Sequence, residues 1–584
     1  MGYLRRMKFY SLAIALILIA TGCGQTPQAE QPLPAFLQDG NQNRTPTYEE
    51  GIAFWEAMAA HYKEVDMHAY GMTDAGYPLH VVIVDGDRPR PIGAYKQGVK
   101  QLVLINNAIH PGESDGVDAS MVLVHELLNS KKGKQLLEEV SLAIIPFYNI
   151  GGALNRNTSS RANQNGPESY GFRGNAQNLD LNRDFVKCDS RNAQSFATLI
   201  NEMDPDLYLE THVSNGADYQ YTITYIPTQE DKLGATLGAK LRDDWTPFIV
   251  DQIQSTGFKI GPYVNVHGAP PDNGFAAFYD SPRYSSGYLA LRQTPGYIIE
   301  THMLKPYAKR VEATKYFLLA SLEMVKKFNV RQVVDASRVE QKTQQEFVLD
   351  WAIDSSVNES LHFEGYTYEY MPSDLTGGQR LKYHRDQPFT KSVPYWNKYK
   401  PTIMITAPKY YVLKRGFVEV EQRLKNMGVE LISLERDTVL RAEVYHIASF
   451  ETSQQPFEKH YYHYNSKVEV VEEEVKLRKG DYIIPLDNLN RRAIVEVLEP
   501  EGPDSYFNWN FFDAILQQKE WFSPYVFEDE AKELLANNAE LKEAFDNWVA
   551  SGEYNAFEKL YWVYKHSSRY EREHLRYPVF RVMR

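Results

Sequence analysis

Short apolar runs alternate with amphipathic segments through the first half of the chain. Two of these segments, residues 117–128 and 311–328, repeat their apolar side chains at the spacing of a helix. The apolar runs have the length of β-strands and occupy residues 80–84, 101–105, 142–147, 207–211, 221–226 and 297–301. This alternation predicts an α/β fold, with a mixed central sheet flanked by helices.

The ordered fold is expected to begin near Thr47. This residue resembles a helix cap and precedes apolar positions at helical spacing, among them Ile52, Trp55 and Met58. The preceding residues 24–46 are rich in Gln, Pro, Asn and Thr, so they have little apolar surface to bury. We therefore predict that residues 24–46 form a flexible tether.

The pattern changes near residue 335. Short β-like runs rich in Tyr, Val and Ile follow, interrupted by a segment at 402–434 with a helical pattern at 416–426. The last sixty residues look helical, and residues 530–548 are amphipathic. We expect one domain at 47–334 and a β-rich accessory region with a helical end at 335–584.

The N-terminus carries a targeting signal. Arg5, Arg6 and Lys8 precede an apolar run at 12–20, which is too short to span a bilayer and ends in Thr21-Gly22-Cys23. The small residues before Cys23 resemble a bacterial lipobox. We expect residues 1–23 to be a lipoprotein signal, with Cys23 acylated after export and the chain anchored to a bacterial membrane on its periplasmic or cell-surface side. An ordinary signal peptide or an uncleaved anchor is the alternative.

Composition narrows the class of protein further. The 584 residues are 43% hydrophobic, enough for a large core, and include only two cysteines. If Cys23 is lipidated, Cys188 has no partner for a disulfide bond within the chain. The formal charge of −13 argues against nucleic-acid binding, which needs clustered Lys and Arg.

Candidate metal ligands stand at the ends of predicted strands. His110 and Glu113 are three positions apart and follow the run at 101–105, and His212 ends the run at 207–211. Such a His-x-x-Glu pair is weak evidence alone, because the spacing is common among surface residues. Glu300 lies in another strand-like run, at 297–301.

A polar segment separates these motifs. It carries Arg173 and the run Asn178-Leu179-Asp180-Leu181-Asn182-Arg183-Asp184-Phe185. Together, the His-x-x-Glu pair, this polar segment, His212 and Glu300 are four motifs in the order of one family. On these motifs, residues 48–330 resemble the zinc carboxypeptidases, the M14 or funnelin family. The chain departs from many members in reading Asn149-Ile150-Gly151-Gly152 where they have Asn-Pro-Asp-Gly, and in its long extension after residue 335.

The resemblance implies a role for each motif. His110, Glu113 and His212 would bind one Zn²⁺ per chain, and Glu300 would be the catalytic base. Two nitrogen ligands and one oxygen ligand with an open fourth position are the catalytic zinc pattern, whereas structural sites close with a fourth ligand, usually a thiolate. Asp180 is the best candidate to hold the other ring nitrogen of His110.

Other residues of the motifs would bind the substrate. In the family, an arginine matching Arg173 stabilises the oxyanion, and residues matching Asn182 and Arg183 bind the C-terminal carboxylate, for which a fixed guanidinium is well suited. Three alternatives remain open. Arg161 or Arg156 could replace Arg173. Tyr279 and Tyr288 compete with Tyr284 as the tyrosine that closes over the substrate. His302 could support the site, whereas His125, His267, His460 and His463 are interpreted as structural.

The expected function is a zinc-dependent metallocarboxypeptidase that hydrolyses the C-terminal bond of peptides or cell-wall peptides. One alternative is a deacylase or amidase of the same fold. Another is a non-catalytic lipoprotein that binds peptide or glycan through residues after 335. In such a binding protein the metal site would be vestigial and would be expected to lack a ligand or the base. The presence of His110, Glu113, His212 and Glu300 argues against this alternative.

Overall fold

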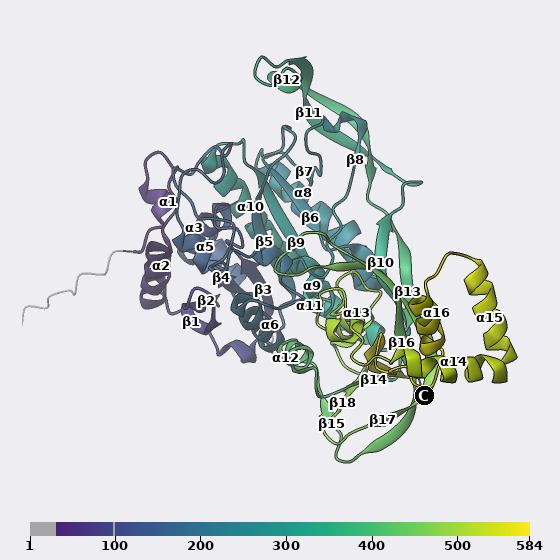
Figure 1. Cartoon of the computed structure of the whole chain (residues 1–584). Coiled ribbons are helices and arrows are strands. Elements are labelled where there is room, and N and C mark those ends of the chain that lie inside the picture. Colours follow the sequence, from purple (N-terminus) through teal and green to yellow (C-terminus); the bar gives the residue numbers. More distant parts are fainter. Residues whose placement is uncertain (1–30, 97, 99, 584) are drawn as a thin grey trace, which may run out of the picture.

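The computed structural model describes residues 31–583 except 97 and 99. Its central element is an eight-stranded sheet in the order β1-β2-β4-β3-β5-β9-β6-β7 (Figure 1). Strands β3, β4, β5 and β9 run parallel, whereas β1, β2 and the pair β6–β9 add antiparallel contacts. The sheet is therefore mixed, as the sequence predicts. Its strands are β1 Val65–Met72, β2 Pro78–Val84, β3 Gln101–Asn106, β4 Val140–Ile145, β5 Leu207–Ser214, β6 Ile223–Pro227, β7 Ile260–Pro262 and β9 Gly296–His302.

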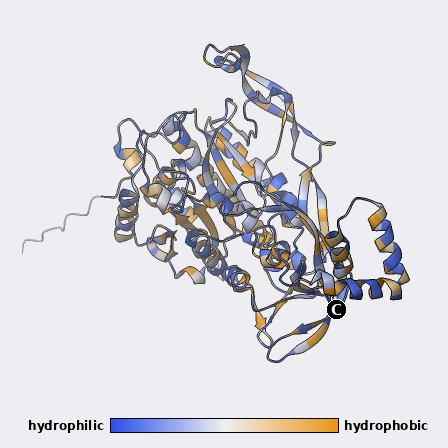
Figure 2. Cartoon of the chain, in the orientation of Figure 1, coloured by the Kyte–Doolittle hydropathy of each residue, from blue (hydrophilic) through white to orange (hydrophobic). Residues whose placement is uncertain are grey.

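Both faces of the sheet are buried. Along β3, Val103 and Ile105 point into one hydrophobic cluster, whereas Leu102 and Leu104 point into another. This burial explains why the strands are apolar without alternation, and Figure 2 shows the central strands coloured mainly as hydrophobic. The helices of this half are α1 Ala35–Gln38, α2 Tyr48–His61, α3 Asp115–Asn129, α4 Lys131–Leu137, α5 Ile150–Leu154, α6 Arg191–Met203, α7 Gly234–Lys240, α8 Thr246–Ser255, α9 Ser285–Ala290, α10 Tyr307–Phe328 and α11 Val330–Lys342.

The start of helix α2 is confirmed at Thr47. The Thr47 hydroxyl accepts a hydrogen bond from the Glu50 amide, and the Glu50 carboxylate accepts one from the Thr47 amide. The prediction of a flexible tether at 24–46 is wrong for residues 36–46, which pack against the fold, and residues 24–30 lie outside the described residues. Phe36 is buried against Tyr307, and the carbonyl of Asn43 accepts a hydrogen bond from the Glu168 amide. One buried aromatic ring and several hydrogen bonds to its backbone carbonyls therefore hold this segment to the fold. Residues 1–23, with Cys23, lie outside the described residues.

The region after residue 335 is rich in β-structure. Helices occupy residues 524–565 of the predicted helical end, but the last element is a strand at 576–582, where the sequence pattern predicts helix. A long hairpin, β11 with β12, extends away from the central sheet (Figure 1). The elements are β10 Glu346–Ile353, β11 Glu359–Pro372, β12 Gln379–Trp396 with β8 Phe275–Ala276, β13 Tyr399–Thr406, β14 Tyr410–Leu413, β15 Ile432–Ser433, β16 Thr438–Thr452, β17 His463–Leu477, β18 Tyr482–Pro485, β19 Arg576–Val582, and helices α12 Val418–Asn426, α13 Arg491–Leu498, α14 Pro524–Asn537, α15 Ala539–Ala550 and α16 Ala556–Lys565. Among the described residues, no helix combines the length and the apolarity needed to cross a bilayer.

The two halves share one hydrophobic cluster. It joins Leu102 and Leu104 of β3 and Phe196 of α6 to Phe347 of β10 and Ile494 of α13. Since burial of apolar surface is the main stabilising contribution to a fold, the accessory region and the central sheet support each other. The sheet therefore has the accessory region packed on one of its faces.

Candidate active site

The candidate ligands meet at the carboxyl ends of neighbouring parallel strands. His110 follows β3, Glu113 precedes α3, and His212 lies within β5. Glu300 lies on β9, directly paired with His212 in the strand register. In open α/β sheets, this edge is where ligands bind. The fold thus brings together groups separated by up to 190 positions in sequence.

Two glycines permit the close packing of Glu113 against β5. A side chain at Gly116, in the first turn of α3, would clash with Thr211. A Cβ at Gly112 would lie 2.8 Å from Cδ of Arg161. Gly116 is needed because Thr211 of β5 occupies the space, whereas at Gly112 the space is filled by the Arg161 side chain and the Gly171 carbonyl.

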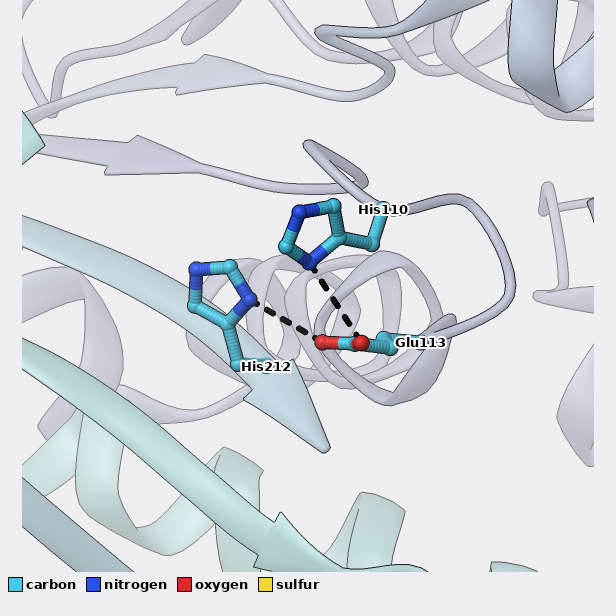
Figure 3. A group of neighbouring side chains, drawn as sticks. All are labelled: His110, Glu113 and His212. Atoms are coloured by element: carbon cyan, nitrogen blue, oxygen red, sulfur yellow. Dashed lines mark hydrogen bonds and ion pairs between the residues drawn. The ribbon is translucent and has the colours of Figure 1, made fainter. Parts of the chain in front are cut away.

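The three predicted ligands face one another (Figure 3). Glu113 Oε1 lies 3.4 Å from Nδ1 of His110, and Oε2 lies 3.0 Å from Nδ1 of His212. All three ligand atoms lie within 4.8 Å of one another, and the side chains are buried. Atoms that share a tetrahedral zinc at about 2.0–2.2 Å stand roughly 3.3 Å apart. The spacing therefore fits one zinc ion.

The hydrogen bonds of His110 also fit a metal ligand. Nε2 of His110 lies 2.9 Å from Oδ1 of Asp180, as predicted for the carboxylate that fixes the tautomer. Nδ1 is buried and has no hydrogen-bond partner among the described residues. With Asp180 accepting a hydrogen bond from Nε2, the lone pair of Nδ1 would be available to a cation.

Charge in the site is dominated by buried carboxylates. Although burial alone would lower it, Glu210 and Glu113 raise the pKa of His212 well above its usual value. Burial opposes ionisation of Glu113, but Arg161 and His110 hold the pKa of this carboxyl well below its usual range. A histidine whose pKa is raised in this way marks a position where positive charge is stabilised, and a bound divalent cation would supply that charge.

Glu300 differs from Glu113 in its surroundings. Burial raises the pKa of Glu300 to about 8, with His212 lowering it and Glu113 raising it. Its side chain is partly exposed to the cavity, and Oε2 has no hydrogen-bond partner among the described residues. A carboxyl group with a raised pKa and a free oxygen is suited to proton transfer near neutral pH.

The site opens into a cavity of about 350 Å³. The predicted residues that line it are His110, Glu113, Arg173, Asn182, Arg183, His212, Tyr284 and Glu300. Asp180 lies behind His110 and outside this lining.

The arginines occupy different positions around the cavity. Arg173 forms an ion pair with Oδ2 of Asp180 at 2.9 Å and remains 46% exposed. Arg183 lies over the ring of Tyr284 at 4.6 Å. Arg156 instead binds the carbonyls of Thr45 and Pro46, away from the cavity lining.

Several competing residues lie elsewhere. Tyr279 contacts Lys232 and Tyr399, and Tyr288 is buried in the hydrophobic cluster beneath the site. Neither lines the cavity, whereas Tyr284 does. The ring of His302 bonds to the carbonyl of Ala217. Of the tyrosines weighed from the sequence, the cavity therefore contains Tyr284.

Sequence reasoning missed some residues of the site, and it considered Arg161 only as a replacement for Arg173. Arg161 donates a hydrogen bond of 2.7 Å to Oε1 of Glu113 and another to the carbonyl of Val213. Glu210 lies 3.0 Å from Nε2 of His212. His267, interpreted from sequence as structural, lines the cavity. Only Glu210 had a usable signal, because positions 210 and 212 share one face of a strand.

Comparisons with known proteins agree with the motifs. Residues 52–223 match the family model of the zinc carboxypeptidases, Peptidase_M14, which confirms the family resemblance and supports a metallopeptidase hydrolase. This segment contains His110, Glu113 and His212, and ends before Glu300. No curated protein matches the chain.

Solved carboxypeptidases are similar over about half of the chain. A metallo-carboxypeptidase from Burkholderia cenocepacia is 16% identical with a TM-score of 0.37, covering 49% of this chain and 70% of its own. The metallo-carboxypeptidase from Pseudomonas aeruginosa, in complex with (2-guanidinoethylmercapto)succinic acid, is also 16% identical with a TM-score of 0.37, covering 49% of this chain and 70% of its own. Carboxypeptidase A from Helicoverpa armigera is 14% identical with a TM-score of 0.34, covering 50% of this chain and 74% of its own.

Proposed function

We propose that this chain is a zinc-dependent metallocarboxypeptidase that releases the C-terminal residue of a peptide or peptide-like substrate. One observation carries the proposal: the triad His110, Glu113 and His212 opens into the same cavity as Glu300 and Arg183. The family match over residues 52–223 supports it independently.

Substrate binding is assigned to the polar turn beside the triad. Asn182 and Arg183 bind the free carboxylate of the substrate, since a guanidinium can form two parallel hydrogen bonds with it. Stacking of Arg183 on Tyr284 keeps the guanidinium plane fixed. Arg173, held by Asp180, donates to the oxygen of the scissile carbonyl as negative charge develops there.

Glu300 moves the proton. Zinc bound by His110, Glu113 and His212 would polarise the scissile carbonyl and make a water molecule acidic enough to attack near neutral pH. Oε2 of Glu300 takes the proton of the attacking water as the new C–O bond forms. Glu300 then gives that proton to the leaving amine nitrogen as the C–N bond breaks.

The cellular setting is proposed from the N-terminal sequence. Export and acylation of Cys23 would hold the enzyme at a bacterial membrane, where protein fragments and cell-wall peptides are both available as substrates. The charge of −13 is consistent with a protein that does not bind nucleic acid.

The test is hydrolysis by purified, zinc-loaded protein. An N-acylated dipeptide, its C-terminal amide, an N-acetyl amino acid and a cell-wall peptide are incubated separately, and products are identified by mass spectrometry. We expect release of the C-terminal amino acid from the free acid in preference to the amide. Cleavage of the N-acetyl amino acid alone would instead identify a deacylase, and no cleavage of any substrate would contradict the proposal.

A further inference from the structure

A loop of the accessory region contacts Asp180, at the start of the turn Leu181–Arg183 in the active site. This loop, residues 453–462, connects β16 to β17 and is here named the 453–462 loop. Oε2 of Glu458 accepts a hydrogen bond of 2.8 Å from the backbone amide of Asp180. The two residues are 278 positions apart, so the contact depends on how the two halves pack.

The 453–462 loop also contacts two residues of the half of the chain that forms the central sheet, Asp189 and Arg283. Nε2 of His460 lies 2.7 Å from Oδ2 of Asp189. The guanidinium of Arg283 lies 4.8 Å from the ring centre of Tyr462, which belongs to the same loop. These contacts lie close to Glu458 in sequence and fix its position.

The backbone at Glu458 is unusual. Glu458 and Lys459 adopt left-handed conformations, with φ of 47° and 78°. Two consecutive non-glycine residues in this region are uncommon. Such conformations persist where the surroundings impose them, and they concentrate at functional sites.

Asp180 is the point at which this contact reaches the active site. Its Oδ1 accepts from the amide of Asn182 at 2.9 Å, and the same carboxylate binds His110 and Arg173. Asp180 also caps the turn Leu181–Arg183, which carries the residues assigned to the substrate carboxylate. Fixing the amide of Asp180 therefore fixes the start of that turn.

We propose that Glu458 is a positioning residue for substrate recognition, acting through Asp180 on the turn that carries Asn182 and Arg183. The accessory region thereby completes the site that binds the C-terminal carboxylate. This inference rests on the proposed carboxypeptidase function. It assigns to a residue far outside the matched segment 52–223 a part in binding the substrate.

The test compares Glu458→Ala with Glu458→Gln in the full-length, zinc-loaded protein. Gln retains an oxygen that can accept from the Asp180 amide, whereas Ala removes it. Loss of one backbone hydrogen bond is large enough to change an equilibrium constant by up to about tenfold. For an N-acylated dipeptide with a free carboxylate, we expect Glu458→Ala to raise KM about tenfold. The kcat should stay within about twofold of wild type, because the lost contact affects substrate binding. Glu458→Gln and the exposed loop control Gln455→Ala should keep the wild-type KM.

Two controls separate this role from a general loss of structure. Zinc content should be unchanged in Glu458→Ala, and KM for the C-terminal amide of the same dipeptide should not rise, because that substrate lacks the carboxylate. An equal rise in KM for acid and amide, or loss of zinc, would overturn the inference.

A measurement without substrate covers the case in which wild-type protein proves inactive. Hydrogen exchange followed by mass spectrometry should show faster exchange of residues 180–184 in Glu458→Ala than in wild type or Gln455→Ala. Unchanged exchange would overturn the positioning role, whereas faster exchange in a protein that hydrolyses no peptide would refute the carboxypeptidase function alone.

Discussion

Replacing Asp180 with Asn is expected to weaken zinc binding by a predictable amount. The Asp180 carboxylate makes three contacts of 2.9 Å, with Nε2 of His110, the amide of Asn182 and the guanidinium of Arg173. All three groups donate hydrogen bonds. The side chain of Asn has one acceptor oxygen and one NH₂ donor, so at least one contact becomes donor against donor.

The magnitude follows from the role of Asp180 in holding His110. Loss of a carboxylate behind a metal-bound histidine typically lowers metal affinity by about 10–100-fold. This corresponds to about 1.4–2.7 kcal/mol of binding free energy. In spite of burial, His110, Arg173 and Arg183 hold the pKa of Asp180 well below its usual range. The carboxylate is therefore charged throughout the working pH range, and the effect should be present from pH 5 to 8.

The assay is competition for zinc against a coloured chelator of known affinity. Asp180→Asn should show a zinc Kd raised about 10–100-fold, on the same basis, while Glu168→Gln, an exposed carboxylate in the same half, should match wild type. Thermal unfolding of the metal-free proteins checks that the fold is intact. If the zinc Kd of Asp180→Asn stays within about twofold of the wild-type value, in place of the rise of about 10–100-fold, the reasoning that Asp180 orients His110 is refuted.

Two further predictions concern the N-terminal anchor and a buried carboxyl group. Metabolic labelling with a fatty-acid analogue should tag the wild-type protein and not Cys23→Ser, and soluble, unlabelled wild-type protein in the periplasm would contradict the anchor. Burial raises the pKa of Asp118 to about 7, whereas the pKa of Asp in the unfolded chain is about 4. The Asp118 carboxyl therefore lowers the free energy of unfolding progressively as the pH rises from about 4 to about 7. The stability of Asp118→Asn relative to wild type should therefore increase over that range, by at most about 4 kcal/mol, and level off above it. Chemical unfolding at pH 4, 5.5 and 7.5 measures this difference, and a difference independent of pH would contradict the raised pKa.

The sequence predicts the central sheet and the metal site for the same reason. The strands are buried on both faces, so they read as continuous apolar runs, and the ligands stand where those runs end. Because the carboxyl ends of parallel strands share one edge, motifs in the right order imply proximity. The resemblance to the zinc carboxypeptidases, carried by motifs in the family's order, is what grouped His110, Glu113 and His212, and the shared edge explains why they meet.

Contacts between distant loops were beyond the reach of sequence patterns. Glu458 approaches the site through a segment without periodicity, and no local signal distinguishes it from other charged loop residues. Arg161 was considered in place of Arg173, but its hydrogen bond to Glu113 was not predicted. Strand β19, Arg576–Val582, lies in the last sixty residues, for which the sequence pattern predicts helix, and its two arginines are buried. In the fold, Arg581 pairs with Glu443 and Glu499, and Arg576 with Glu473. Tertiary neutralisation of this kind depends on residues that are remote in sequence.

The most direct test of the account is to measure zinc content and peptide hydrolysis together in Glu300→Gln. Gln keeps the shape of the side chain but cannot accept the proton of the attacking water. General base catalysis contributes about 10²–10⁴-fold. The account predicts that kcat falls by about this factor, while the variant retains one zinc per chain and a KM near wild type. Retention of most of the wild-type kcat, or loss of activity together with loss of zinc, would contradict it.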